Sequence, residues 1–368
     1  MSAAPGPIAV YGATGYTGRL VAAELRRRSL DVVLCGRDIE KLRGLAASVG
    51  PVDVRAAAVG DRDALRRAFG DCAVVINCAG PFTVLGEPEV RAAVETGTHY
   101  VDIAGEQTFI KLVAERFDEA ATAAEVAVVP AMGFDYVPGD LLCRVVGRAV
   151  EPLDELDLAY AVAGFGATRG TLRSALEAMA GGDVVWEDGA WQPAAAGPLR
   201  ARAVFPEPFG RQVVAKYPCG EIVSVPRHTR VRTIRARVAV ETMVPAGRMA
   251  PLVPALMATG GAWLRTPLRR VLQVAIGLLP DGPSEDERRG ARFVIAVRAR
   301  GADGSSRSGW VRGSDVYGLT AVTTVHAASL LAAPGYDRTG VLSAASAFDP
   351  EAFLDHLREH AVEWEAGA

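Results

Sequence analysis

A glycine-rich turn near the N-terminus constrains this chain more than any other feature. An apolar strand is expected over residues 8–11, and Gly12, Gly15 and Gly18 follow it before an amphipathic helix. Glycines at such positions allow a tight exit from the strand, close approach of a pyrophosphate, and close packing of the helix on the sheet. The N–H groups and the dipole at the helix N-terminus attract anions. The spacing GxxGxxG, placed between strand and helix, therefore predicts a dinucleotide site rather than ordinary turn glycines.

Composition narrows the class of protein. The 368 residues exceed the usual length of one domain, so two or more are expected. The net charge of −3 gives no field that favours nucleic acid. The cysteines form no CxxC pair and no HExxH motif occurs, so we expect buried reduced thiols and no metal site. We find no leader and no apolar run of about 18 residues, which predicts a cytoplasmic protein without a membrane span.

The first 150 residues alternate between apolar strands and amphipathic helices. This alternation predicts an α/β fold, a Rossmann doubly wound parallel sheet over residues 1–150. The expected helices that follow the first one cover residues 39–49, 62–69, 87–96, 109–124 and 139–149.

Arg37 stands where the cofactor's ribose is normally recognised, directly after the second strand. An acid at this place would accept hydrogen bonds from the 2′-hydroxyl of NAD. A guanidinium instead matches a 2′-phosphate in a bidentate manner, which favours NADP(H). Asp38 is interpreted as the N-cap of the next helix. The alternative is that Arg37 stacks on the adenine or caps that helix.

Further cofactor contacts are expected at the carboxyl ends of the third and fourth strands. Val59 and Asp61 would lie at the adenine edge, although Asp61 is also suited to cap a helix. Small residues in the segment NCAGPF would let the cofactor lie against the chain, or would simply mark a strand-to-loop transition. The predicted cofactor-binding residues are Gly12, Ala13, Thr14, Gly15, Tyr16, Thr17, Gly18, Arg37, Val59, Asp61, Cys78, Ala79, Gly80, Pro81 and Phe82.

Three residues are candidates for catalysis. Asp102 lies at the carboxyl end of the fifth strand, and Asp135 and Tyr136 lie in the loop after the sixth, so all three should face one crevice. Tyr136 could donate a proton or bind a carbonyl, and Asp135 could position it. For Asp102 the structural alternative is that its carboxylate binds nearby backbone N–H groups. A tyrosine followed four residues later by lysine, the short-chain dehydrogenase pair, is absent.

Four motifs in order, GATGYTG, NCAGPF, HYVDIAGE and GFDYVPGDLL, resemble the saccharopine dehydrogenase-like oxidoreductases. Within them the chain is most similar to the trans-acting enoyl reductase group, and the likeness extends to TRGTLRSALEAMAGG, GPSEDERRGARF and TGVLSAASAF. The resemblance implies an NADP-binding Rossmann domain, an inserted α/β domain and a C-terminal return. It also implies hydride transfer, in the enoyl reductases to a C=C bond of a polyketide-derived acyl chain.

The second half of the chain has a different pattern of polar and apolar residues. Alternating polar and apolar residues over 153–164 and 232–242 predict a second α+β domain, residues 151–315, with an antiparallel sheet that favours a homodimer. Residues 249–279 predict two apolar helices, which would pack on this sheet, cover an apolar substrate or touch a membrane surface. Residues 316–331 and 351–363 predict helices, within a segment 316–368 that returns to the Rossmann domain.

These observations favour an NADPH-dependent reductase that acts on the C=C bond of an apolar substrate, free or carrier-bound. Two alternatives stay open. An imine reductase of the saccharopine type would need arginines for substrate carboxylates, for which Arg169, Arg173 and Arg227 are candidates. A non-catalytic NADP-binding protein would bind the cofactor without oxidising it.

Overall fold

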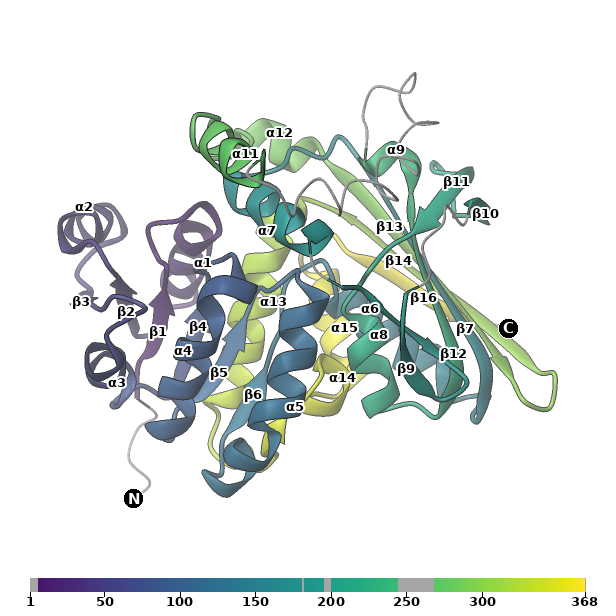
Figure 1. The fold of residues 1–368 in the computed structure, drawn as a ribbon, viewed down its shortest axis with the longest axis horizontal. Coiled ribbons are helices and arrows are strands. Elements are labelled where there is room, and N and C mark those ends of the chain that lie inside the picture. Colours follow the sequence, from purple (N-terminus) through teal and green to yellow (C-terminus); the bar gives the residue numbers. More distant parts are fainter. Residues whose placement is uncertain (1–5, 181, 195–199, 244–267, 368) are drawn as a thin grey trace. The chain divides into compact units, whose positions relative to one another are not determined.

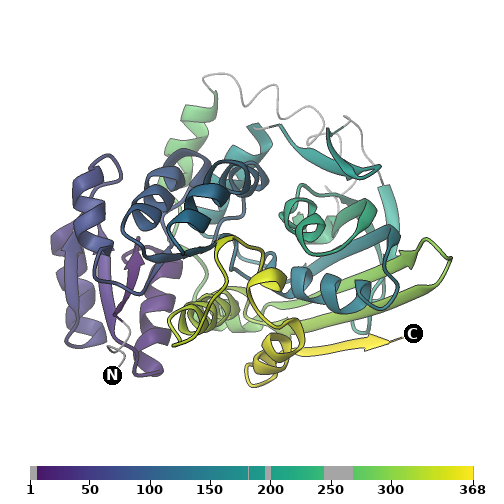
Figure 2. The same ribbon diagram turned by 90° about the horizontal axis from the view of Figure 1, so that it is seen from below.

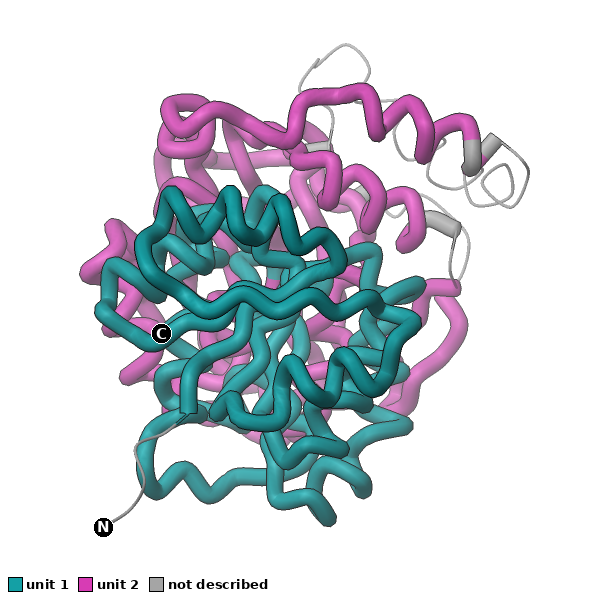
Figure 3. Tube along the Cα trace, turned by 90° about the vertical axis from the view of Figure 1, so that its left-hand side faces the viewer, with its two compact units in different colours: residues 1–104, 109–135, 317–348 teal, residues 105–108, 136–316, 349–368 magenta. Residues whose placement is uncertain are grey.

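The chain divides into two compact units (Figure 3). Unit 1 comprises residues 1–104, 109–135 and 317–348, and unit 2 comprises residues 105–108, 136–316 and 349–368. The computed structural model describes residues 6–180, 182–194, 200–243 and 268–367. These units differ from the expected domains, whose boundaries were 150/151 and 315/316, because each unit is built from non-consecutive stretches.

The described residues of unit 1 form a seven-stranded sheet in which every pair is parallel. The strand order is β3-β2-β1-β4-β5-β6-β15, and its first six strands have the Rossmann order. The order reverses between β1 and β4, where ligands bind open α/β sheets. The strands are β1 (Ile8–Tyr11), β2 (Val32–Gly36), β3 (Asp53–Ala56), β4 (Val74–Asn77), β5 (His99–Asp102), β6 (Ala127–Val129) and β15 (Gly340–Val341).

Helices cover both faces of this sheet, with α4 and α5 on one face and α1 and α13 on the other (Figures 1 and 2). The helices are α1 (Tyr16–Arg27), α2 (Ile39–Val49), α3 (Arg62–Phe69), α4 (Phe82–Glu95), α5 (Gln107–Ala123), α13 (Val316–Leu331) and α14 (Ala344–Ala347). The bounds of α2, α3 and α13 agree with the prediction. The prediction for α4 was wrong at its start, which lies at Phe82, because Pro88 is inside the helix rather than in its first turn.

The described residues of unit 2 form a nine-stranded sheet, in which β8 and β9 branch from the path β10-β11-β12-β7-β13-β14-β16. The predicted antiparallel pairing is corrected at one place, since β7 and β12 run parallel. Residues 164–230 connect them as a crossover, which a parallel pair requires. The strands are β7 (Leu153–Ala163), β8 (Val184–Glu187), β9 (Ala190–Pro193), β10 (Arg200–Val204), β11 (Arg211–Lys216), β12 (Val231–Ala239), β13 (Arg292–Gly301), β14 (Ser306–Ser314) and β16 (Glu363–Gly367).

The first helix of this unit, α6 (Val137–Gly147), packs on β13 and β14. Leu156 and Leu158 of β7 are buried in the same core. The expected C-terminal helix ends at Arg358, and β16 then pairs with β14 in unit 2, so this part does not return to the Rossmann sheet. The other helical elements are α7 (Arg169–Ala180), α8 (Glu221–Ser224), the 3₁₀ turn η1 (Val225–Arg227), α9 (Val240–Met243), α11 (Leu268–Gly277), α12 (Glu285–Gly290) and α15 (Pro350–Arg358).

The predicted apolar pair of helices lies mostly outside the described residues, which exclude residues 244–267. The described part, α11, packs on α7, where Arg269 and Gln273 donate to Glu177. Val271, Val274 and Leu278 remain exposed. Among the described residues, no helix has the length and apolar character that crossing a bilayer requires.

Candidate functional site

The turn between β1 and α1 has the geometry of an anion cradle. Gly12 leaves β1 at a φ of +76°, a conformation that favours glycine, and its N–H donates to the carbonyl of Cys35 at 3.0 Å. The exposed Gly15 is the N-cap of α1, and no described side chain caps this end. The first turn of α1 holds no acid. Its N–H groups and dipole are therefore available to a phosphate.

The three glycines of the turn have different surroundings. A Cβ on Gly12 would lie 2.9 Å from the backbone nitrogen of Ala79, so this glycine allows the β1 and β4 loops to meet. A Cβ on Gly18 would collide with the Gly12 carbonyl, so it allows α1 to pack on the turn. A Cβ on Gly15 would approach only the Gly12 carbonyl, at 3.3 Å, and otherwise points into open space. The sequence prediction places the cofactor's pyrophosphate in that space.

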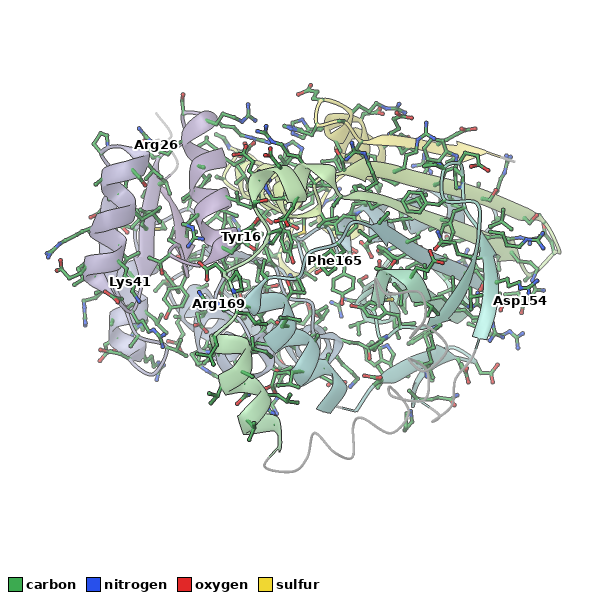
Figure 4. The ribbon with its side chains drawn as sticks, turned by 90° about the horizontal axis from the view of Figure 1, so that it is seen from above. Tyr16, Arg26, Lys41, Asp154, Phe165 and Arg169 are labelled. Atoms are coloured by element: carbon green, nitrogen blue, oxygen red, sulfur yellow. The ribbon has the colours of Figure 1, made fainter. Side chains whose placement is uncertain are left out.

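The remaining residues of the turn support this cradle. Ala13 is buried, and Tyr16 packs edge-on against Tyr317 at 5.3 Å between ring centroids (Tyr16 is labelled in Figure 4). Sequence reasoning missed Arg19, whose guanidinium donates to the Thr14 carbonyl at 2.8 Å and so brings a positive charge to the turn. The signal was present, because Arg19 directly follows the last glycine of the motif.

The loop after β4 forms the other wall in unit 1. The Cys78 N–H donates to the Tyr11 carbonyl at 2.8 Å, which holds residues 78–80 beside the glycine turn. Desolvation raises the pKa of the Cys78 thiol, and the nearby Asp102 carboxylate raises it further, so the thiol stays protonated. The Phe82 ring is buried against Phe109, with ring centroids 5.6 Å apart, and belongs to the core.

Sequence reasoning also missed Asn77, the last residue of β4. Its side chain accepts from the Ala79 N–H at 2.9 Å and donates to the Tyr100 hydroxyl at 3.1 Å. Asn77 is fully buried and pairs in register with Asp102. A polar residue at the end of an apolar strand was the available signal.

The residues predicted to contact the adenine and its ribose lie at the surface or are only half-buried. Arg37 is exposed directly after β2, as a residue that reaches a 2′-phosphate should be. Asp38 accepts from the Lys41 N–H at 3.1 Å, which confirms that it caps α2. Asp61 caps α3 by accepting from the Ala64 N–H at 2.9 Å. Val59 is half-buried between β3 and α3.

The three catalytic candidates differ in their surroundings. Asp102 is buried, and one carboxylate oxygen accepts from the N–H groups of Ala104 at 2.9 Å and Ala131 at 2.8 Å, as the structural alternative expected. Asp135 is exposed at the end of a stretch of unit 1. Tyr136 begins a stretch of unit 2, where it is buried and its hydroxyl donates to the Gly105 carbonyl at 2.6 Å.

One of the three arginines of the imine alternative, Arg169, is engaged elsewhere. Arg169 (labelled in Figure 4) forms an ion pair with Asp281 and donates to the Gly277 carbonyl at 3.2 Å. Because these contacts occupy its guanidinium, Arg169 is poorly suited to hold a substrate carboxylate.

Comparison with curated proteins finds two informative relatives. The saccharopine dehydrogenase-like oxidoreductase of Rattus norvegicus is 31% identical over 155 residues, which cover 37% of this chain and 36% of the relative. The trans-acting enoyl reductase of Mycobacterium leprae (strain TN) is 35% identical over 151 residues, which cover 39% of this chain and 36% of the relative. The matched segment thus spans 36% of the length of either relative.

Two further comparisons concern the fold and the cofactor domain. The apo histidine-tagged saccharopine dehydrogenase (L-Glu forming) from Saccharomyces cerevisiae is similar in fold, with a TM-score of 0.63 and 14% identity, over 99% of this chain and 100% of that one. The family model of the saccharopine dehydrogenase NADP binding domain matches residues 8–129, which contain the glycine turn, Arg37 and the β4 loop. Residues 8–129, about a third of the chain, are therefore similar to the saccharopine dehydrogenase NADP binding domain family, and this similarity supports NADP(H) as the cofactor.

Proposed function

We propose that this chain is an NADPH-dependent oxidoreductase that reduces a C=C bond of an apolar, acyl-derived substrate. The observation that carries the proposal is the cradle in unit 1, where the glycine turn and the β4 loop meet at the point of strand-order reversal. NADPH, when bound, supplies the hydride. The protein's part is to hold and orient it, which accounts for much of the catalysis in such enzymes.

Specific residues would share this task. The N–H groups at the start of α1, helped by Arg19, would hold the pyrophosphate, and Arg37 would bind the 2′-phosphate. Residues 78–80 would lie along the cofactor. Asp102, Asp135 and Tyr136 remain our candidates for orienting the substrate and for handling its proton. Because the Tyr136 hydroxyl donates to Gly105, Tyr136 would have to give up that bond before acting as a donor.

An acyl substrate is supported by two observations of different kinds. One matched relative is named a trans-acting enoyl reductase. In unit 2, α11 exposes Val271 and Val274, which are three positions apart on one helical face, and Leu278 is exposed directly after the helix; such a surface suits apolar ligands. The engagement of Arg169 with Asp281 counts against a substrate rich in carboxylates. The homodimer and the cytoplasmic location expected from the sequence stay predictions.

The decisive experiment offers the protein and NADPH a panel of α,β-unsaturated thioesters and, separately, a panel of imines. We expect the absorbance of the reduced nicotinamide to fall with at least one long-chain thioester and with none of the imines. Saturated thioesters of equal length serve as the control for binding without reduction. Oxidation by imines alone would favour the saccharopine-type alternative. Tight NADPH binding without oxidation by any acceptor would favour a non-catalytic protein.

A further inference from the structure

The loop after β6, residues 130–135, is held by a helix from far along the chain. The Phe134 N–H in this loop donates to the Thr320 hydroxyl of α13 at 3.0 Å, and both residues are buried. Asp135, one of the three catalytic candidates, directly follows Phe134. Because a buried N–H without a partner is costly, this hydrogen bond fixes the backbone immediately before Asp135.

Two further threonines of α13 contact the same loop. The hydroxyls of Thr323 and Thr324 lie 2.8 and 3.1 Å from the Met132 carbonyl, and both also reach carbonyls of their own helix. These three residues are fully buried. A Cβ on Gly133 would lie 3.4 Å from the Thr320 methyl group, so the loop and the helix are in close contact here.

The loop is also bonded to β5. The Ala131 N–H donates to the Asp102 carboxylate at 2.8 Å, and the Met132 N–H donates to the Asp102 carbonyl at 2.6 Å. Ala131 has a φ of +62°, in the left-handed region that disfavours residues other than glycine. Such a conformation persists only where the surroundings determine it, and it is found at sites where function needs a fixed geometry.

The same turn of α13 contacts the cofactor cradle. Tyr317 precedes Thr320 by three positions, and its ring packs edge-on against Tyr16 of the glycine turn. The glycine turn follows β1 and the loop follows β6, and these strands are separated in the sheet by β4 and β5 (Figure 1). All of these residues belong to unit 1. One helical turn thus contacts both the cradle and the loop that carries Asp135.

We propose that α13 sets the position of Asp135 relative to the bound dinucleotide, and that Thr320 is a positioning residue for the reduction. This inference rests on the proposed function. Reduction of a C=C bond adds a hydride at one carbon, and the electron pair of the double bond takes a proton at the other. A group that orients the substrate or handles that proton must therefore be fixed relative to the hydride donor, since a displacement of about 1 Å can lower the rate about 100-fold.

Replacing Thr320 by valine tests the hydrogen bond at nearly constant side-chain volume. With a thioester that the wild type reduces, Thr320→Val should lower kcat about 10- to 100-fold. The affinity for NADPH, measured by the fluorescence of the reduced nicotinamide, should stay unchanged. Thr320→Ser retains the hydroxyl and should retain most of the wild-type kcat.

Thr98→Val is the matched control for this substitution. Thr98 is also buried in unit 1, and its hydroxyl donates to the Phe69 carbonyl at 3.1 Å. It directly precedes β5 and therefore lies at the amino edge of the sheet, away from the loop after β6. The control should lose a comparable buried hydrogen bond and keep the wild-type kcat.

A double-mutant cycle separates positioning from general structural damage. Asp135→Asn should lower kcat by itself, and adding Thr320→Val should lower it little further, because both changes act through the same group. Fully multiplicative losses in the double variant would overturn the inference. So would an unchanged kcat in either single variant, or an equal loss of kcat in Thr98→Val.

Amide hydrogen exchange provides a readout that does not depend on turnover. The Phe134 N–H should exchange slowly in the wild type and in Thr320→Ser, and faster in Thr320→Val. Equal exchange rates in the three proteins would overturn the inference alone. A wild type that oxidises NADPH with no acceptor would instead remove the proposed function, and the positioning role of Thr320 with it.

Discussion

Arg37 is the residue on which the choice between the two nicotinamide dinucleotides depends. It follows β2 directly, is exposed, and is succeeded by Asp38, whose carboxylate is already used to cap α2. No acid is therefore left at this position to accept hydrogen bonds from a free ribose hydroxyl. A guanidinium at the same place gains a charge-assisted, bidentate contact only when a 2′-phosphate is present.

Replacing Arg37 by alanine should lower the affinity for NADPH about 10- to 100-fold, since a hydrogen bond to a charged group is worth about 1.5–3 kcal/mol. The affinity for NADH should hardly change. Titration of both dinucleotides, followed by the fluorescence of the reduced nicotinamide, measures the two constants. Arg43→Ala is the matched control, because Arg43 lies on the outer face of α2 and pairs with Glu40. Equal losses for NADPH and NADH would assign Arg37 to the adenine instead.

Among single residues, the sequence correctly predicted those whose role depends only on neighbours in the chain. Asp38 and Asp61 cap helices, and such caps depend on residues only three positions apart. Asn77 and Glu89 were missed because their significance depends on what other segments bring beside them, whereas Arg19, which contacts Thr14 of its own turn, was within reach of the sequence. Asn77 meets Tyr100 across two strands, and Glu89 gains its surroundings only when α4 covers the sheet.

At the scale of elements, α4 carries the largest departure from sequence expectation. It begins at Phe82, with Pro88 and Glu89 inside it, and it buries a carboxyl on its sheet-facing side. Hydrophobic periodicity cannot anticipate this, because a glutamate is expected on an outer face.

The buried glutamate should make the stability of unit 1 depend on pH. The pKa of Glu89 is raised from 4.5 to about 8, so the folded state binds its proton more tightly than the unfolded state. The resulting stabilisation is fully present below pH 4.5 and is lost as the pH rises to about 8. Relative to Glu89→Gln, the wild type should lose up to about 1.4 kcal/mol per pH unit over this range. Urea unfolding of both proteins across the range measures the difference, and parallel stability curves would contradict the prediction.

Strand direction in unit 2 was also beyond the reach of pattern reasoning. Alternation of polar and apolar residues identified β7 and β12, yet an alternating strand looks the same whether its neighbour is parallel or antiparallel. The expected last helix ran to residue 363, beyond the end of α15 at Arg358, and only the open edge of β14 explains why the residues that follow form a strand.

At the scale of the whole molecule, the two units differ in their content of tryptophan, and therefore in their intrinsic fluorescence. Every tryptophan belongs to a stretch of unit 2, namely Trp186, Trp191, Trp263, Trp310 and Trp364. Unit 1 contains the cofactor cradle and no tryptophan.

Saturating NADP⁺ should therefore stabilise the unit that lacks tryptophan. Occupancy at one hundred times the dissociation constant adds about 2.7 kcal/mol to the free energy of unfolding of the unit that binds. We expect part of the thermal transition measured by far-ultraviolet circular dichroism to move to a higher midpoint temperature. The midpoint measured by tryptophan fluorescence should not change. An equal shift of both signals would mean that the units unfold as a single block. NAD⁺ at the same concentration is the control ligand.

Because the two units are built from alternating stretches of the chain, their arrangement affects folding during translation. The chain passes between units five times, at 104/105, 108/109, 135/136, 316/317 and 348/349, and β15 adds to β6 only after residue 340. The nucleotide-binding unit therefore cannot complete its sheet while the first half of the chain is being translated. One edge of β6 therefore stays unpaired during translation until β15, some two hundred residues later in the chain, has been synthesised.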